Sequence, residues 1–176
     1  MRSRLRKMTV ELFRKTMKGQ LPLFEPISKG KESPMWSLRI TARLTFFILL
    51  SIPHDYDKFY VEIAWSNDGE FPWDRHSEVV KAELPKCRQR LQYLWSNEDN
   101  SPWSIVPELS HEERMKIIME SDDDDDTPLR QPDPPLEEAL KRVPPLVEDA
   151  VNKVVEYAIP LFKKVTEHRK LKWPSA

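Results

Sequence analysis

The sequence has little glycine, little cysteine and almost no net charge. Only three of its 176 residues are glycine, which argues against glycine-rich phosphate-binding loops, because those loops need positive φ angles and close backbone approach. Cys87 is the single cysteine, so no disulfide can form within the chain, as is typical of the reducing cytoplasm. The formal net charge of -1 gives no overall attraction to nucleic acid or to an acidic membrane.

Long apolar runs are also missing. The most apolar stretch, residues 44–52, is about half the ~20 residues that a membrane-spanning helix needs. The basic start, residues 1–7, is not followed by a continuous apolar segment, so we expect no secretory signal. The sequence therefore predicts a cytoplasmic protein without a membrane segment.

What the chain does contain is a strong alternation between residues 38 and 52. Every even position there is apolar, whereas the odd positions begin polar and become apolar halfway. Because side chains alternate faces along a strand, this pattern predicts a half-buried antiparallel sheet that other elements must cover. We expect two strands, at 36–52 and 58–66, with a bend or bulge near 41–43, because the first is too long for one flat strand.

Helical spacing of apolar residues occurs near both ends of the chain. Residues 3–18 form one predicted helix, and an apolar stripe predicts the longest helix at 145–170. We expect the prolines at 144–145 to interrupt this C-terminal region and Pro160 to kink the long helix. Ser110 and Glu113 form a capping box that should open a further helix.

Smaller elements complete the predicted fold. Strand-like alternation returns at 88–95, and residues 103–106 favour a last short strand. The fold class is therefore α+β: an antiparallel sheet of four to six strands, covered on one face by the N-terminal helix and the long C-terminal helix.

The chain divides into three segments that form a single domain overall. Residues 1–120 hold the first helix and the sheet, and residues 136–176 hold the C-terminal helices that pack back on it. Between them, residues 121–135 are acidic and rich in proline, with five consecutive aspartates at 122–126. Like-charge repulsion and the shortage of apolar groups predict a linker there.

Several short segments form a recognisable pattern: 59–66, 71–72, Arg88, Arg90 and Leu91 with Trp95 and Trp103 downstream, and 157–162. This pattern resembles one in small uncharacterised bacterial proteins of the domain-of-unknown-function type. The resemblance covers about residues 5–110 and 145–168 and omits the acidic insert. It implies an antiparallel sheet between an N-terminal helix and C-terminal helices, and it implies no established activity or functional residue.

Two aromatic residues in one loop are candidates for binding. Trp73 follows Phe71 in a segment whose short polar flanks make a tryptophan hard to bury. The pair can form an exposed anchor of the kind that dominates protein interfaces. Alternatively, the loop folds its own aromatic side chains back over the sheet.

Charged residues at strand positions form a second candidate group. If the strands are neighbours, Glu62 can pair with an arginine across the sheet. One interpretation is a solvated ion pair that contributes ~0.2–1 kcal/mol, and the other is an arginine-lined surface that binds an acidic partner or a phosphate. The candidate arginines are Arg39, Arg43, Arg88 and Arg90.

The evidence for catalysis is weaker. Asp74 and His76 can form an acid–base pair, and with Glu62 they define an alternative hypothesis, a hydrolase or nuclease. No nucleophile motif accompanies them, and a solvated loop explains the same residues. The metal-type side chains at 54–57 lie at a turn, so we expect no metal and no cofactor.

We therefore predict a non-catalytic bacterial protein-interaction module, such as an accessory, immunity or defence-system component, that binds another protein. The basic terminal helices at 2–18 and 163–172 give a further alternative, nucleic-acid binding. The sequence does not predict the partner, the oligomeric state or the role of the aspartate run.

Overall fold

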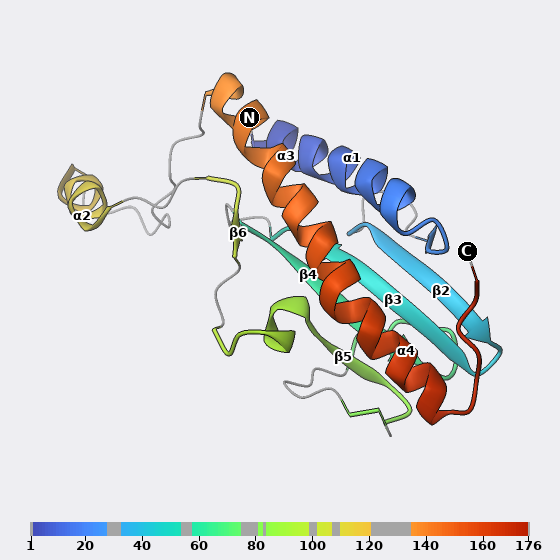
Figure 1. The fold of residues 1–176 in the computed structure, drawn as a ribbon. Coiled ribbons are helices and arrows are strands. Elements are labelled where there is room, and N and C mark those ends of the chain that lie inside the picture. Colours follow the sequence, from blue (N-terminus) through green and yellow to red (C-terminus); the bar gives the residue numbers. More distant parts are fainter. Residues whose placement is uncertain are drawn as a thin grey trace.

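The computed structural model describes residues 2–27, 33–53, 58–74, 81–82, 84–98, 102–106, 110–120 and 135–175. Four α-helices and the six strands of one sheet account for most of these residues, and their arrangement is shown in Figure 1. In chain order the elements are α1 (Arg2–Gln20), β1 (Glu25–Pro26), β2 (Met35–Thr41), β3 (Leu44–Ser51), β4 (Lys58–Ser66), β5 (Cys87–Arg90), the 3-10 turn η1 (Leu91–Leu94), β6 (Trp103–Ser104), α2 (His111–Glu120), α3 (Leu136–Lys153), the π-helical turn η2 (Val154–Ala158) and α4 (Ile159–His168).

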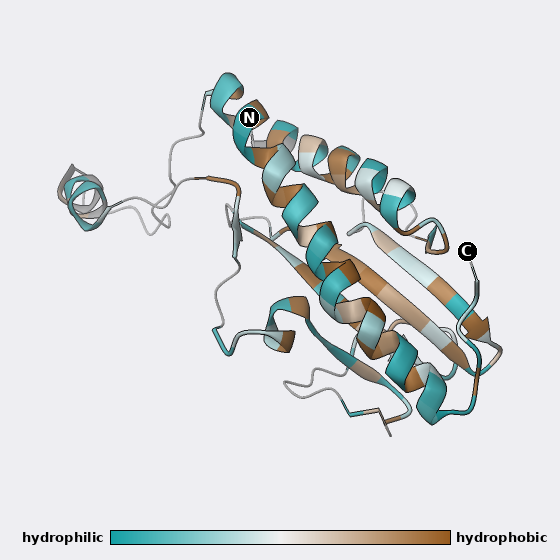
Figure 2. Cartoon of the chain, viewed as in Figure 1, coloured by the Kyte–Doolittle hydropathy of each residue, from teal (hydrophilic) through white to brown (hydrophobic). Residues whose placement is uncertain are grey.

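The sheet is antiparallel, with the strand order β1-β2-β3-β4-β5, and the short strand β6 pairs with β4. Helices α1, α3 and α4 lie over the same face of this sheet, which we call the helix-covered face (Figure 1). The central strand β3 is apolar along most of its length (Figure 2). The predicted α+β fold, with its N-terminal and long C-terminal helices on one side of an antiparallel sheet, is confirmed.

The region predicted as one bent strand at 36–52 is two strands, so that prediction was wrong. Ala42 and Arg43 form a tight turn that joins β2 to β3. The Arg43 amide donates to Thr41 Oγ1 at 3.1 Å, and this side-chain bond stabilises a turn that contains no glycine or asparagine. An irregular register between Arg39 and Thr41 keeps even-numbered residues on the helix-covered face in both strands.

The core lies between the helix-covered face and the three helices. Phe162 of α4 stacks on Phe46 of β3, with 4.4 Å between the ring centroids, and Phe13 of α1 meets Trp36 of β2 at 5.3 Å. Trp36 and Trp65 are both buried in this core. The apolar stripe of the C-terminal helices packs into the same cluster through Val143, Val147, Val151, Val154, Ala158, Phe162 and Val165.

The prolines at 144–145 act differently from our expectation. Helix α3 continues through Pro144 and Pro145 without interruption. The carbonyls four residues earlier lose their helical donors, but they belong to exposed residues, where water can replace those donors. Pro160 follows η2, in which the Ile159 amide bonds to the Val154 carbonyl five residues back. This wider turn accommodates a proline that would otherwise clash with the preceding turn.

Two smaller predictions have mixed outcomes. The predicted strand at 88–95 is correct only for β5, because the chain turns into η1 at Leu91. The capping box is present: the Ser110 amide donates to Glu113 Oε2 at 2.8 Å, and the Glu113 amide donates to Ser110 Oγ at 3.2 Å. The acidic segment 121–134 lies outside the described residues.

Candidate functional site

The face of the sheet opposite the helices gathers most of the predicted binding residues. Strand register places Glu62 opposite Leu49 on one side and opposite Arg90 on the other, with Ala64 opposite Arg88. Because side chains of paired residues point to the same side of a sheet, all of these share one face, which we call the second face. Its strand residues are Met35, Ser37, Arg39, Thr45, Phe47, Leu49, Ser51, Tyr60, Glu62, Ala64, Ser66, Arg88 and Arg90.

A small apolar cluster forms the centre of the second face. Phe47, Leu49 and Ala64 are buried there, together with Phe71 from the loop that follows β4. The Phe71 ring meets the edge of Phe47 at 5.6 Å, which is a favourable aromatic geometry. Phe71 is only 6% exposed, so this half of the loop folds back over the sheet.

Trp73, two residues farther along the same loop, does not pack against the sheet. Trp73 is 61% exposed, although its ring lies 4.6 Å from that of Phe71. The two interpretations left open by the sequence are therefore each correct for one residue: Phe71 covers the sheet and Trp73 presents its indole to solvent.

Arg88 holds this arrangement together. Its Nε lies 2.5 Å from Glu62 Oε2, and its NH1 donates to the Trp73 carbonyl at 3.0 Å. The guanidinium also lies 5.3 Å from the Phe71 ring centroid and 5.6 Å from that of Trp73, within cation–π range. One arginine thus links a strand carboxylate to the loop that carries the exposed tryptophan.

Glu62 is mostly removed from water, at 7% exposed, which distinguishes this pair from an ordinary surface ion pair. A charged group that loses its hydration needs a partner with good geometry, and removing that partner strongly lowers the free energy of unfolding. The cross-strand pairing expected for Glu62 is present, with Arg88 as the partner. It is a fixed structural contact that positions Trp73, rather than a solvated pair.

The loop begins at a turn that is itself stabilised by charge. Asp68 accepts a hydrogen bond from the Glu70 amide at 3.1 Å, and Gly69 takes a φ of 79°, a conformation that suits glycine. Lys86 of the segment before β5 forms an ion pair with Asp68. The hydrogen bond from Lys86 lowers the pKa of Asp68 to about 2, and the same contact raises the pKa of Lys86.

Two further arginines, Arg39 and Arg90, lie on the second face. Arg90 lies over the Tyr60 ring, with 4.3 Å from the guanidinium carbon to the centroid. Arg39 is exposed and donates from Nε to the Thr41 carbonyl at 3.4 Å. Sequence reasoning did not select Tyr60 as a site residue, although it occupies the same alternation in β4 as Glu62, and that alternation was the available signal.

Arg43 lies away from this group, at the tip of the β2–β3 hairpin. Its carbonyl accepts from Arg169 NH1 at 3.4 Å. Arg169 also donates to Asn67 Oδ1 and, at 3.0 Å, to the Leu84 carbonyl, and burial lowers its pKa. One of the cations in the predicted basic C-terminal helix therefore anchors the end of the chain on the sheet.

The residues of the catalytic hypothesis do not come together among the described residues. Glu62 bonds to Arg88, Asp74 is exposed in the loop, and His76 lies outside the described residues, as do residues 54–57. Within the part of the chain that the structure describes, no three His, Cys, Asp or Glu side chains are placed to hold a metal ion.

Comparison of the chain with protein-family models, with curated proteins and with solved structures gave no match. The resemblance to small bacterial α+β proteins therefore stays a prediction. None of the described helices combines the length and the apolar character needed to cross a membrane.

Proposed function

We propose that this protein is a non-catalytic protein-interaction module that binds an acidic partner protein on the second face of its sheet. Trp73 would serve as the central anchor, and Arg39 and Arg90 would contact carboxylates of the partner. The observation that carries the proposal is the state of Trp73: its indole is largely exposed, while its loop is held by the Arg88–Glu62 pair.

This combination is the one that protein interfaces use. Tryptophan and arginine are enriched among the residues that dominate binding energy, and an exposed side chain that is already ordered loses less conformational entropy on binding. The Phe71 ring packs against the indole of Trp73, with 4.6 Å between the two ring centroids. A partner would therefore meet a preformed aromatic surface rather than a loop that must first be ordered.

The acidic character of the partner follows from the charges of the same face. Three arginines and one glutamate occupy its strand positions, and the glutamate is neutralised by Arg88. Arg39 adds an exposed positive charge to this face, which favours carboxylates as binding groups. Placement in the bacterial cytoplasm, as an accessory, immunity or defence component, belongs to the same proposal. A single cysteine that is buried is typical of a reducing compartment.

The test uses the full chain as bait in an extract of the cells from which the gene comes. We expect one protein to be retained in a stoichiometric amount by the wild-type chain. Retention should fall at least tenfold for Trp73→Ala, because truncating a central tryptophan commonly costs about 2 kcal/mol or more of binding energy. Raising the salt concentration should weaken retention, because the arginine contacts are screened.

The control is Val155→Ala, which truncates another exposed apolar side chain, 41% exposed, on the helical side of the molecule. It should retain the partner as well as the wild type does. Failure to capture any stoichiometric protein, or equal capture by Trp73→Ala, would overturn the proposal. Capture of RNA or DNA that Trp73→Ala abolishes would replace the protein partner by a nucleic acid, since bases also stack on exposed tryptophan.

A further inference from the structure

A hollow of about 510 Å³ opens where the tip of the β2–β3 hairpin meets the end of α4. It is lined by Thr41, Ala42, Arg43, Asn67, Arg169 and Leu171. The chain leaves α4 at Arg169, takes a left-handed conformation at Lys170 with a φ of 57°, and passes the tip of the hairpin (Figure 1). Farther along, the Trp173 ring centroid lies 5.8 Å from that of Phe46. This packing holds Arg169 beside the hairpin.

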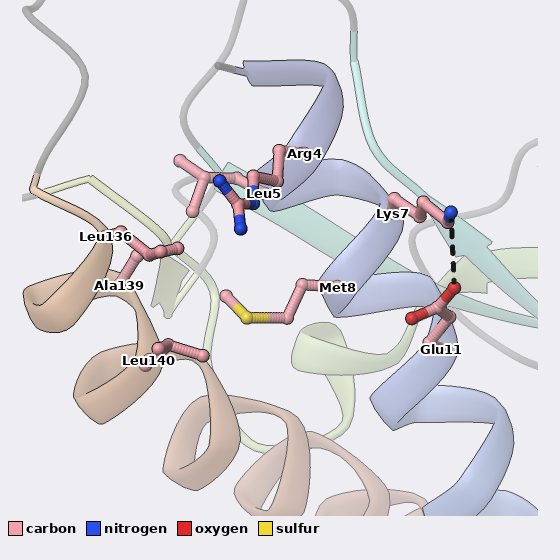
Figure 3. Close-up of a pocket in the computed structure, with 8 residues that line it drawn as sticks. All are labelled: Arg4, Leu5, Lys7, Met8, Glu11, Leu136, Ala139 and Leu140. Carbon is pink, nitrogen blue, oxygen red and sulfur yellow. Dashed lines mark ion pairs between the residues drawn. The ribbon is translucent and has the colours of Figure 1, made fainter.

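The charged residues that line this hollow have one sign. Both of them, Arg43 and Arg169, are cations. Asp68, the sequence neighbour of one lining residue, already forms an ion pair with a lysine. The groove between α1 and α3 is different, because Lys7 pairs there with Glu11 at 3.9 Å and both signs of charge are present (Figure 3). The hairpin hollow therefore attracts an anion, whereas the groove selects neither sign.

Arg169 is a partly buried cation whose bonding partners are all neutral. Its NH1 donates to the Arg43 carbonyl and to Asn67 Oδ1, and its NH2 donates to the Leu84 carbonyl. Burial lowers the pKa of Arg169, and among the described residues no carboxylate compensates for this loss of hydration. Arg88, by contrast, pairs with a glutamate across the sheet. An anion in the hollow would supply the charge that Arg169 lacks.

The hydrogen-bonding groups left over in the hollow are donors. A guanidinium has five N–H groups, and the three bonds of Arg169 leave its Nε–H and one NH2 hydrogen without an acceptor among the residues that the structure describes. Because Asn67 Oδ1 accepts from Arg169, the Nδ2 group of that amide can donate. Thr41 Oγ1 likewise accepts from the Arg43 amide, so its hydroxyl hydrogen is left to donate. Two arginines, an amide and a hydroxyl thus offer donors to one ligand.

We propose that this hollow binds the phosphate group of a phosphate monoester. Such a group carries a charge of about −1.5 to −2 at neutral pH and three acceptor oxygens. It therefore matches two guanidinium groups with further donors better than a planar carboxylate, which has one charge and two oxygens. The organic part of the ester would lie against Ala42 and Leu171. The site lies at the hairpin tip, and the proposal does not rest on the one made for Trp73.

The test is an NMR titration of the full-length, nitrogen-15-labelled protein with phenyl phosphate, near neutral pH and at constant ionic strength. We expect saturable shifts of the Arg169 Nε–H and Asn67 Nδ2 resonances, because these donors would contact phosphate oxygens. Arg43→Gln should weaken the affinity about tenfold, as expected when a hydrogen bond between charged groups is lost. The Arg43 side chain is exposed and makes no bond to a described residue, so this variant should fold like the wild type.

The control variant is Arg14→Gln, which removes an exposed arginine of α1 that does not line the hollow. It should change the affinity by less than about twofold, because salt screens a distant surface charge. Benzoate is the control ligand, since it carries the same ring on a carboxylate, and it should bind several-fold more weakly than phenyl phosphate.

A phosphotyrosine peptide, titrated in parallel, identifies the source of the ester. Tighter binding of the peptide than of phenyl phosphate would assign the monoester to a protein, and equal or weaker binding would assign it to a small molecule. Shifts that do not saturate, equal affinities for benzoate and phenyl phosphate, or equal affinities of Arg43→Gln and the wild type would each overturn the proposal.

Discussion

The two faces of the sheet share the strand β3 but are covered in different ways. On the helix-covered face, helices from both ends of the chain bury a continuous apolar layer. On the second face, the apolar cluster is small: Phe71, from the loop after β4, packs with the strand residues Phe47, Leu49 and Ala64. The comparison teaches that, among the described residues, the helices bury the apolar side chains of the first face, whereas the loop after β4 buries Phe71 on the second face and leaves Trp73 exposed.

The largest expected loss of stability comes from a substitution in the core under the helix-covered face. Phe162→Ala removes a fully buried ring that stacks on Phe46. The lost burial and the cavity left behind should lower the free energy of unfolding by about 3–5 kcal/mol, measured by chemical denaturation. The exposed substitution Val155→Ala serves as the control and should change stability by less than about 0.5 kcal/mol. A loss below 1 kcal/mol for Phe162→Ala would mean that α4 does not cover the sheet.

The next effect concerns the second face. Glu62→Ala removes the carboxylate from Arg88 and leaves a mostly buried guanidinium without its charged partner. Because Arg88 keeps its bond to the Trp73 carbonyl, we expect a loss of about 2 kcal/mol, below the range for a fully buried pair. Glu62→Gln keeps an acceptor and should lose less. Equal stability of Glu62→Ala and the wild type would show that the pair is merely solvated.

A smaller effect is expected at the exposed side chain itself. Trp73→Ala should lower stability by only about 1 kcal/mol, the energy of an aromatic pair beyond its burial, because the indole is mostly in water. Trp73→Phe should restore most of this loss. A loss as large as that of Phe162→Ala would show that Trp73 belongs to a core, and the contrast between the two faces would disappear.

The smallest effect lies at the start of the loop. The pKa of Asp68 is lowered to about 2, chiefly by the hydrogen bond from Lys86. A lowered carboxyl pKa stabilises the folded state above the unfolded value of 3.8, and this contribution is lost as the pH falls from there toward 2. Lys86→Met should move the pKa of Asp68 back toward 3.8 in a carbon-detected NMR titration. An unchanged titration would contradict the contact.

Much of the fold is predictable from the sequence, for identifiable reasons. Alternation along residues 38–52 and the stripe in the C-terminal helices each describe one buried surface, and together they require the observed layers. The β2–β3 hairpin was missed because its turn, Ala42 and Arg43, carries none of the usual turn residues. The change from polar to apolar odd positions was the signal: it marks the passage from β2 to the central strand β3.

The candidate site was only partly predictable. Alternation placed Glu62 on the face opposite Ile63, and the pairing with an arginine followed from cross-strand geometry. The choice of Arg88, and the opposite fates of Phe71 and Trp73, depend on where a loop meets the sheet. Loops have no side-chain period, so no local pattern distinguishes the buried aromatic residue from the exposed one.

The central claim is that Trp73 is exposed and yet held in place by Arg88 and Glu62. Fluorine NMR of the full chain labelled with 5-fluorotryptophan tests it directly, because each of the six tryptophans gives its own resonance and Trp73→Phe assigns the one of interest. We predict that this resonance shows the largest solvent isotope shift, lies away from the unfolded position, and shifts part of the way toward that position in Glu62→Ala, because Arg88 keeps its bond to the Trp73 carbonyl, while the other five stay unchanged. A wild-type Trp73 resonance already at the unfolded position, or one that Glu62→Ala does not move, would contradict the account.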